Sequence, residues 1–383
     1  MSRPTAILFL VTEDWYFWSH RLNLARACRD RGWRVTVATR VDRHGEAIVA
    51  EGFELVPLGL RRRGRNPVGE TAAILEILRL YRRVRPDIVH QVALKPALYG
   101  TLAARLAGVP VVVNALAGLG YVFASDEAAA RRLRPAVTAA FRLLLDRPGQ
   151  HVIVQNPDDR RLLVDAGTVG AKRISIIRGS GVDCEHFRPT PEPPGPPVAA
   201  LVARMLWDKG VGEAVEAADI LRRDGAGVRV VLVGRPDPDN PRAVPTQTLR
   251  QWNDGGRLEW WGHRDDVAAV WAEAHMAILP TTYGEGLPKC LLEAAACGRP
   301  LIATDAPGCR ELVEDGVTGL LVPPRDPAAL AAAVRRLAED ADLRRQLGAA
   351  ARRAVVERFS DAVIVGEVME LYDRLLAAAG RVR

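Results

Sequence analysis

Cysteine is scarce in this sequence of 383 residues, which holds only Cys28, Cys184, Cys290, Cys297 and Cys309. Five cysteines do not form a disulfide framework in a chain of this length, so we expect reduced thiols in a cytoplasmic protein. No CxxC pair and no neighbouring histidine completes a zinc pattern among them. We therefore predict that the chain binds no metal ion.

Long apolar segments are also few. The first, MSRPTAILFLV, meets Glu13 and Asp14 too soon for an export signal, so we expect no signal peptide. The longest uncharged run, residues 106–125, has the length of a membrane span, but Pro110, Asn114 and three glycines divide it. A buried strand followed by a glycine-rich loop is the structure that we predict there.

Common cofactor motifs are missing as well. No GxGxxG follows the first predicted strand, where VTEDWYFWSH stands, and this argues against an NAD-binding domain. No Walker A motif occurs either. The acidic residues of PDPDN (236–240) lie in a proline-rich loop, so we assign them no role in metal binding. We expect no cofactor.

The net charge of +7 comes from the first half of the chain. Residues 1–187 hold 28 Lys/Arg against 18 Asp/Glu, whereas the remaining residues hold 25 against 28. The basic clusters are LRRRGR (60–65), RLYRRVR (79–85) and RRLR (131–134). Aromatic residues do not interleave with them, so we predict no nucleic acid partner. An anionic inner-membrane surface fits them better, and a generally arginine-rich composition is the alternative.

Apolar strands alternate with helical segments along both halves of the chain. Examples of the strands are residues 5–11, 34–40, 87–92, 198–204, 229–234 and 276–280. Continuous apolar strands between amphipathic helices predict parallel sheets that are covered on both faces. The fold class is therefore α/β, with two doubly wound Rossmann-like domains facing a central cleft, where such sheets bind ligands.

The boundary between these domains is marked by FRPTPEPPGPPVAA, residues 187–200, which contains six prolines. Such a composition predicts a stiff, extended connection. We therefore expect a first domain over residues 1–187, a linker over 188–197 and a second domain over 198–360.

The second domain contains YGEGLPKCLLEA, residues 283–294, in which two acids stand eight positions apart. A strand-like stretch precedes it, and a helix is predicted to begin near Leu287, with Pro288 in its first turn. The N-terminus of a helix favours an anion such as a phosphate, and free N–H groups at Gly286 and Leu287 would face it.

Glu285 and Glu293 then lie on either side of this predicted anion position. Carboxylates accept hydrogen bonds from vicinal hydroxyls, so one acid can hold a ribose and the other a hexose, with a diphosphate between them. These features predict a site for a nucleotide sugar.

Further polar residues follow two other strands of the same domain. Arg204 and Lys209, in ARMLWDKG, can supply two cations to a diphosphate. His263 and Arg264, in GHRDDV, follow another strand, where we expect backbone groups to meet the edge of a base. Each pattern is weak alone and gains weight from the two acids nearby.

The segment 283–294 closely resembles the donor domain of glycosyltransferase family 4, and so does the following CGRPLIATDAPGCRELVEDGVTGLLVPPRD. The members of that family are retaining enzymes of the GT-B fold. FWSHRLNLARACRDRGWRVTVAT, IRGSGVDCEHFRP and VARMLWDKG resemble other parts of that family, so the likeness covers nearly the whole chain. It implies that residues 361–383 cross back to the first domain.

The resemblance also implies roles for the residues named above. Arg204 and Lys209 would contact the diphosphate, and Glu293 the ribose. Glu285, with Gly286 and Leu287, would contact the donor sugar and phosphate. We therefore assign catalysis to Arg204, Lys209 and Glu285, and donor binding to Glu293, Gly286, Leu287, His263 and Arg264.

The first domain resembles, in HQVALKPALYG and NALAGLGYVF, a subgroup that acts on polyprenyl-diphosphate-linked sugars. Many family members place a histidine after the fourth or fifth strand, where this sequence has Asn114; that residue or a backbone carbonyl would replace it. We assign acceptor binding to His20, Lys95, Asn114 and Tyr121.

These features together predict a hexosyltransferase. It would move a hexose or N-acetylhexosamine from a nucleotide-diphosphate sugar, a UDP-sugar, to a lipid-linked or glycan acceptor in surface polysaccharide or glycan synthesis. We expect it to be cytoplasmic and peripheral on the inner membrane. A GT-B epimerase or hydrolase of nucleotide sugars is the alternative, and a non-catalytic sugar-nucleotide-binding subunit is a third.

Overall fold

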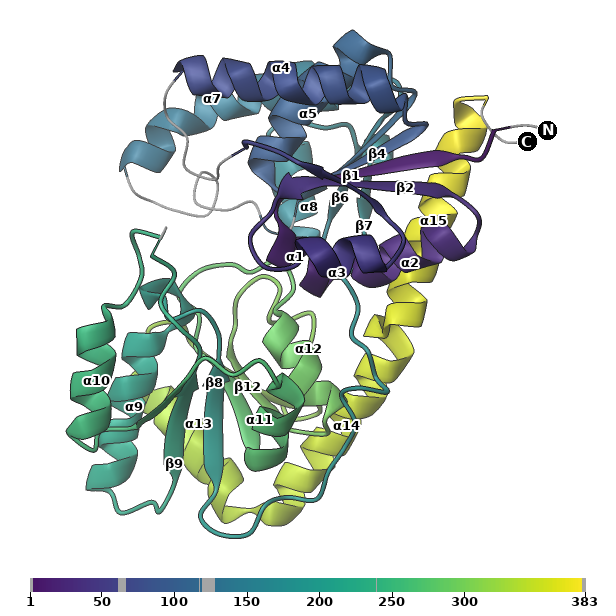
Figure 1. Cartoon of the computed structure of the whole chain (residues 1–383). Coiled ribbons are helices and arrows are strands. Elements are labelled where there is room, and N and C mark those ends of the chain that lie inside the picture. Colours follow the sequence, from purple (N-terminus) through teal and green to yellow (C-terminus); the bar gives the residue numbers. More distant parts are fainter. Residues whose placement is uncertain (1–2, 61–66, 117, 119–127, 239, 381–383) are drawn as a thin grey trace. The chain divides into compact units, whose positions relative to one another are not determined.

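The computed structural model describes residues 3–60, 67–116, 118, 128–238 and 240–380 (Figure 1). The chain forms two compact units. The first comprises residues 1–180 together with 364–383, and the second comprises residues 181–363.

The first unit is built on a parallel seven-stranded sheet with the order β3-β2-β1-β4-β5-β6-β7. All eight residues of β1 are buried, as continuous apolar strands require when helices cover both faces. The strands are β1 (Ala6–Glu13), β2 (Arg34–Arg40), β3 (Glu54–Pro57), β4 (Ile88–Val92), β5 (Val111–Leu116), β6 (Gln150–Val154) and β7 (Ile174–Ile176).

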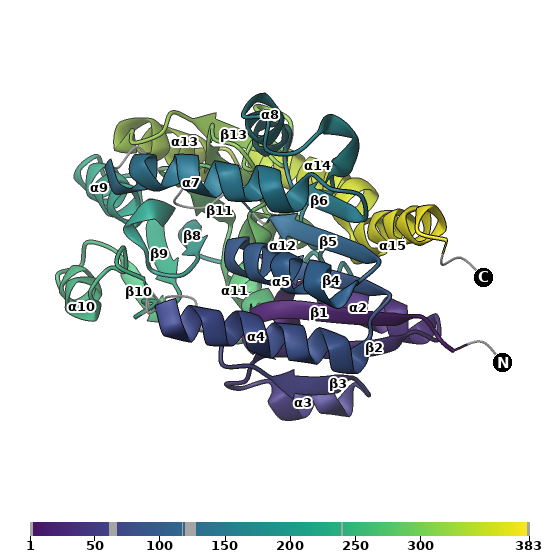
Figure 2. The same cartoon turned by 90° about the horizontal axis from the view of Figure 1, so that it is seen from above.

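Helices cover both faces of this sheet. The apolar side chains of α4 and α5 pack on one face, where Figure 2 also shows α7, and those of α2 and α15 pack on the other. The helices are α1 (Asp14–His20), α2 (Leu22–Asp30), α3 (Gly45–Ala50), α4 (Pro67–Val84), α5 (Leu94–Ala107), α7 (Ala128–Leu145), α8 (Pro157–Asp165), the 3₁₀ helix η1 (Ala171–Arg173) and α15 (Asp361–Ala378).

The second unit has a parallel six-stranded sheet with the order β10-β9-β8-β11-β12-β13. Its strands are β8 (Val198–Val202), β9 (Arg229–Val233), β10 (Glu259–Gly262), β11 (Met276–Leu279), β12 (Leu301–Thr304) and β13 (Gly319–Val322). Side chains of α9 and α13 pack on one face, and those of α11, α12 and α14 on the other.

The helices of this unit are η2 (Trp207–Lys209), α9 (Val211–Arg223), α10 (Thr246–Asp254), α11 (Val267–Glu273), α12 (Lys289–Ala296), α13 (Pro327–Glu339) and α14 (Ala341–Phe359). Three of them begin at an aspartate whose side chain accepts a hydrogen bond from the first turn: Asp266, Asp326 and Asp340. This is the ordinary way to satisfy free N–H groups at a helix start.

The proline-rich residues 188–197 lie within the second unit. Arg299 donates to the Thr190 hydroxyl over 2.7 Å, and Arg344 donates to both carboxylate oxygens of Glu192 over 2.7 Å. These contacts fasten the stretch to that unit. The chain passes from one unit to the other at 180/181 and returns at 363/364.

The predicted fold class of doubly wound parallel α/β domains is confirmed. One detail of the sequence interpretation was wrong. Helix α12 begins at Lys289, with Pro288 as its N-cap, and not near Leu287. Within the described residues, no helix is both long and apolar enough to cross a membrane.

Candidate functional site

The candidate site lies where β8 and β11 end in the second unit. These two strands are neighbours in the sheet, with β9 and β10 on one side and β12 and β13 on the other. The connections after β8 and β11 therefore leave in opposite directions, which makes this position the topological switch point of the sheet. Lys209 follows β8 and Glu285 follows β11.

Gly210 allows these two connections to approach closely. It has a φ of +75°, and a Cβ there would lie 1.9 Å from the carbonyl oxygen of Pro280. The backbone N–H of Thr282 donates to the carbonyl oxygen of Asp208 over 3.0 Å, which fastens the two loops together. A side chain at position 210 would separate them.

The Glu285 carboxylate is held by the residues that this approach brings near it. Lys209 Nζ lies 2.6 and 2.7 Å from its two oxygens, and the Thr281 hydroxyl lies 3.0 Å from Oε1. Both charged side chains are largely buried, with 15% of Lys209 and 11% of Glu285 exposed. The pair is therefore shielded from water and only slightly open to a ligand.

The charge of Lys209 is stabilised by this arrangement. Burial lowers the pKa of Lys209, but the charges of Glu285 and Tyr283 and the hydrogen bond to Glu285 raise it, and the pKa lies above its ordinary value. Lys209 therefore remains a cation throughout the neutral range and can attract an anion.

A third loop, after β12, supports the backbone of Glu285. The Glu285 N–H donates to the Pro307 carbonyl over 2.9 Å. Gly308 has a φ of +82°, and a Cβ there would lie 2.4 Å from the Gly286 oxygen and 2.6 Å from the Glu285 oxygen. Glycine is therefore required where this loop meets the Glu285–Gly286 segment.

Gly286 and Leu287 precede the N-cap of α12, so they are not its first turn as the sequence had suggested. Glu293 is the fifth residue of this helix, just over one turn from its start. Its side chain is 9% exposed, and no hydrogen-bond donor among the described residues contacts its carboxyl. Burial raises the pKa of Glu293 to about 7, and nearby Lys289 lowers it less.

Arg204 follows β8 and stays partly exposed, with its Nη1 2.6 Å from the Asp237 carboxylate. His263 and Arg264, beyond the edge strand β10, are bound to other side chains. His263 Nε2 lies 3.1 Å from Asp265, and Arg264 donates to Glu273 over 2.9 Å. These contacts, within the described residues, do not join His263 and Arg264 to the Lys209–Glu285 pair.

The sequence interpretation missed Thr281 and Asp237. Thr281 is fully buried beneath Glu285 and also lies 3.0 Å from the Asp208 carbonyl oxygen. Its position as a polar residue shortly after the apolar strand β11 is the sequence signal that could have indicated it. Asp237 belongs to PDPDN, which we had read as an uninvolved loop, and it holds Arg204.

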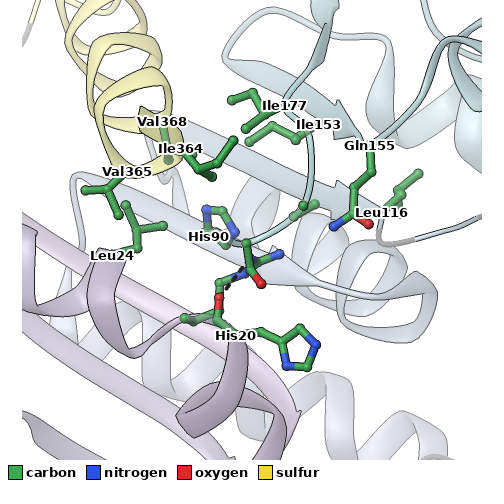
Figure 3. Close-up of a pocket in the computed structure, with 14 residues that line it drawn as sticks. His20, Leu24, His90, Leu116, Ile153, Gln155, Ile177, Ile364, Val365 and Val368 are labelled. Atoms are coloured by element: carbon green, nitrogen blue, oxygen red, sulfur yellow. Dashed lines mark hydrogen bonds between the residues drawn. The ribbon is translucent and has the colours of Figure 1, made fainter. Parts of the chain in front are cut away.

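The four predicted acceptor residues of the first unit fall in different places. His20 ends α1, stacks on Tyr16 and lines a small pocket (Figure 3). Lys95, in the first turn of α5, lies 2.8 Å from the Glu70 carboxylate of α4. Tyr121 lies outside the described residues.

Asn114 is placed differently from what contact with an acceptor requires. It is fully buried in β5, 3.2 Å from the Thr101 hydroxyl and 3.5 Å from the Gln150 side chain. Its amide is used inside the unit, so we do not carry it into the proposal below.

Over the described part of the chain, no group of three or more His, Cys, Asp or Glu side chains is arranged to hold a metal ion. All five cysteines are free thiols.

Comparison with known families and sequences gives consistent matches. Residues 196–340 match the family described as "Glycosyl transferases group 1", and residues 6–156 match "Glycosyl transferase 4-like". The chain is 25% identical over 369 residues to the N,N'-diacetylbacillosaminyl-diphospho-undecaprenol alpha-1,3-N-acetylgalactosaminyltransferase of Campylobacter jejuni, covering 93% of this chain and 95% of that one. It is also 25% identical to the UDP-Gal:alpha-D-GlcNAc-diphosphoundecaprenol alpha-1,3-galactosyltransferase of Escherichia coli, with 80% of each chain covered.

Solved structures share the fold over almost the full chain. HepE from Anabaena, in complex with UDP and glucose, superposes with a TM-score of 0.79 at 19% identity and covers 97% of this chain and 100% of that one. Sucrose-phosphate synthase from Thermosynechococcus elongatus gives a TM-score of 0.78 at 22% identity, with 98% and 100% covered. At these identities the likeness establishes the fold.

Proposed function

The chain belongs to the group 1, family 4-like glycosyltransferases, and from this membership we propose that it transfers a hexose or N-acetylhexosamine from a UDP-sugar. The acceptor is a hydroxyl of a polyprenyl-diphosphate-linked saccharide in surface polysaccharide or glycan assembly. The names of the Campylobacter jejuni and Escherichia coli relatives, both of which act on undecaprenyl-diphosphate-linked sugars, support this acceptor class.

The observation that carries the proposal is the Lys209–Glu285 pair at the switch point of the second sheet. The diphosphate of the donor needs positive charge as its bond to the sugar breaks, and Lys209 is a buried cation at the position where such sheets bind ligands. Arg204 adds a second cation when it exchanges Asp237 for a phosphate oxygen. Glu285 fixes the Lys209 ammonium and accepts hydrogen bonds from the donor sugar.

Glu293 serves the other end of the donor. Its carboxyl is largely buried, and no hydrogen-bond donor among the described residues contacts it, so its oxygens are available to a ligand. The two hydroxyls of a ribose are suitable donors.

The reaction proceeds with retention of configuration. The bond between the anomeric carbon and the leaving phosphate oxygen breaks, and the acceptor oxygen bonds to that carbon from the same face. The departing diphosphate takes the proton of the acceptor hydroxyl, so no protein base is required. Because Lys209 and Arg204 supply the positive charge, transfer is expected to continue in EDTA.

We place the enzyme at a membrane surface, where a polyprenyl acceptor resides. Helix α4 supports this placement, because Arg79, Arg82 and Arg83 are exposed on it, as are the apolar Val68 and Leu75. Exposed arginines beside apolar side chains suit an anionic lipid surface.

The proposal is tested by incubating the protein with a panel of UDP-sugars and a short-chain prenyl-diphospho-N-acetylhexosamine. Mass spectrometry should show the acceptor enlarged by one sugar residue, and Glu285→Gln and Lys209→Met should each remove most of this product. Release of free sugar or of an epimer, with or without acceptor, would support a hydrolase or epimerase instead.

A further inference from the structure

A buried arginine in the first unit lacks the partner that such a charge requires. Arg21 joins α1 to α2 and is 6% exposed. Its Nη1 donates to the His20 carbonyl oxygen over 3.0 Å, while its Nε–H has no acceptor in the described part of the chain. Among the described residues, no carboxylate forms an ion pair with it.

The other buried arginines show how this chain ordinarily satisfies such groups. Arg344, 5% exposed, forms two hydrogen bonds with the Glu192 carboxylate. Arg299, 3% exposed, donates to the Trp271 carbonyl oxygen, to the Thr190 hydroxyl and to the Pro191 carbonyl oxygen. A buried charge without such partners destabilises the fold. Arg21 therefore calls for an anion.

A second buried donor lies close to Arg21. His90, in β4, is 1% exposed, and its Nδ1 lies 2.6 Å from the Tyr372 hydroxyl. The buried phenol makes no other hydrogen bond with the residues that the structure describes, so its O–H donates to Nδ1, and the proton of the neutral ring is on Nε2. Nε2 has no partner. Burial, with the charge of Arg21, holds the His90 pKa well below its ordinary value, so the ring stays neutral.

Both donors line the pocket of Figure 3, which has a cavity volume of ≈ 20 Å³. The figure shows His90, on β4, and Gln155, which directly follows β6, at this pocket, together with Ile153 and Ile177. This volume admits atoms the size of a water molecule, such as carboxylate or phosphate oxygens, and excludes a sugar ring. The apolar lining strengthens any charged hydrogen bond formed inside.

The position in the sheet also suits a ligand. The strands β1 and β4 are neighbours, and β2 and β5 lie on their outer sides, so the first sheet has its switch point there. Arg21 follows β1 through α1, and His90 is on β4.

We propose that Arg21 and His90 form a binding site for an oxyanion, a carboxylate or phosphate group, in the first unit. The anion accepts hydrogen bonds from Arg21 Nε–H and His90 Nε2–H. The site itself does not depend on the proposed transfer reaction, whereas the acceptor as the source of its anion rests on that proposal. Its anion is either the phosphate of a prenyl-diphosphate acceptor or a free small anion, and both present the same oxygens.

Thermal unfolding of the wild-type chain in increasing sodium phosphate, at constant ionic strength, tests the site. A ligand that binds only the native state raises the melting temperature in proportion to ln(1 + [L]/Kd). The wild type should show this rise, and Arg21→Met should not. Arg79→Met, which removes an exposed arginine of α4, should behave as the wild type. In phosphate-free buffer Arg21→Met should melt no lower than the wild type, because it removes an unpaired buried charge.

The proposal is overturned if Arg21→Met responds to phosphate as the wild type does, or if it melts lower at every phosphate concentration by the same amount. If Arg21→Met does not fold, the ³¹P NMR linewidth of phosphate is measured instead with the wild type and with Arg21→Lys. The wild type should broaden the phosphate signal, and Arg21→Lys should broaden it less. An unbroadened signal with the wild type would overturn the site. Repeating the titration with geranyl diphosphate identifies the source. An Arg21-dependent rise at lower concentration than with phosphate indicates the acceptor, and an equal or smaller rise indicates a free anion.

Discussion

At the scale of single residues, the two acids of 283–294 have different surroundings. Glu285 is paired with Lys209 and contacts Thr281, whereas Glu293 is buried without a hydrogen-bond donor among the described residues. Their spacing in the sequence indicated that both belong to one site. It could not show this difference, because the partners of Glu285 come from loops distant in the sequence.

Replacing Lys209 by Met should strongly destabilise the second unit. The Glu285 carboxylate would remain largely buried without its cation, and removing one member of such a pair costs about 3–5 kcal/mol. Urea unfolding measures the loss. The exposed Lys172→Met is the control, and adding Glu285→Gln to Lys209→Met should recover part of the stability. Equal stability of Lys209→Met and Lys172→Met would show that the pair is solvated.

Replacing Glu293 by Gln should remove a pH dependence of stability. Burial raises the pKa of Glu293 from 4.5 to about 7, so the native state retains a proton that the unfolded chain loses near pH 4.5. Between these values, raising the pH lowers the free energy of unfolding, by roughly 3 kcal/mol in total.

Urea unfolding from pH 4.5 to 8 tests this. Glu293→Gln should gain stability relative to the wild type as the pH rises, while Glu339→Gln, which changes an exposed acid of α13, should follow the wild type. A constant difference between Glu293→Gln and the wild type would contradict the raised pKa.

At the scale of elements, local pattern predicted most strands and helices but not their contacts. The pattern of apolar residues that marks each strand or amphipathic helix lies within that segment, so the order of the elements could be predicted from the sequence. Which face a strand residue occupies depends on register. Asn114 points toward Thr101 of α5, and His90 toward Tyr372 of α15, 282 positions away. Neither partner could be inferred from local sequence.

Gly210→Ala tests the close approach that forms the candidate site. A Cβ there would lie 1.9 Å from the Pro280 oxygen, and φ is +75°, so both strain and displacement of the loop are expected. We expect a loss of more than about 1 kcal/mol in urea unfolding, with weaker UDP binding by calorimetry. Gly212→Ala, inside α9, is the control and should be neutral or stabilising, because its Cβ would meet only Trp207 at 3.5 Å. Similar behaviour of the two variants would argue against the close approach.

At the scale of the whole molecule, the asymmetric charge suggests how the enzyme reaches its acceptor. The first 187 residues carry the excess of basic residues, and exposed arginines lie at the end of α4. Composition could show this excess without any structure. It could not show that Val68 and Leu75 are exposed on the same helix as these arginines.

Replacing Arg82 and Arg83 by Ser should weaken binding to vesicles that contain anionic lipid. Each basic residue near such a surface contributes about 1 kcal/mol, so affinity should fall by about 30-fold at low salt. Co-sedimentation measures it, and binding of the wild type should weaken in high salt. Arg222→Ser with Arg223→Ser, at the end of α9, is the matched control. Equal loss in both double variants would indicate that only net charge matters.

The central claim is that this chain transfers a sugar with retention of configuration, and the fate of the anomeric carbon tests it most directly. A UDP-sugar labelled with ¹³C at that carbon is incubated with the prenyl-diphospho-sugar acceptor, with EDTA present, and followed by NMR. We predict that the label moves into a glycosidic bond to the acceptor with its α configuration unchanged. Label in free sugar, in an epimerised nucleotide sugar or in a β-linked product would contradict the account.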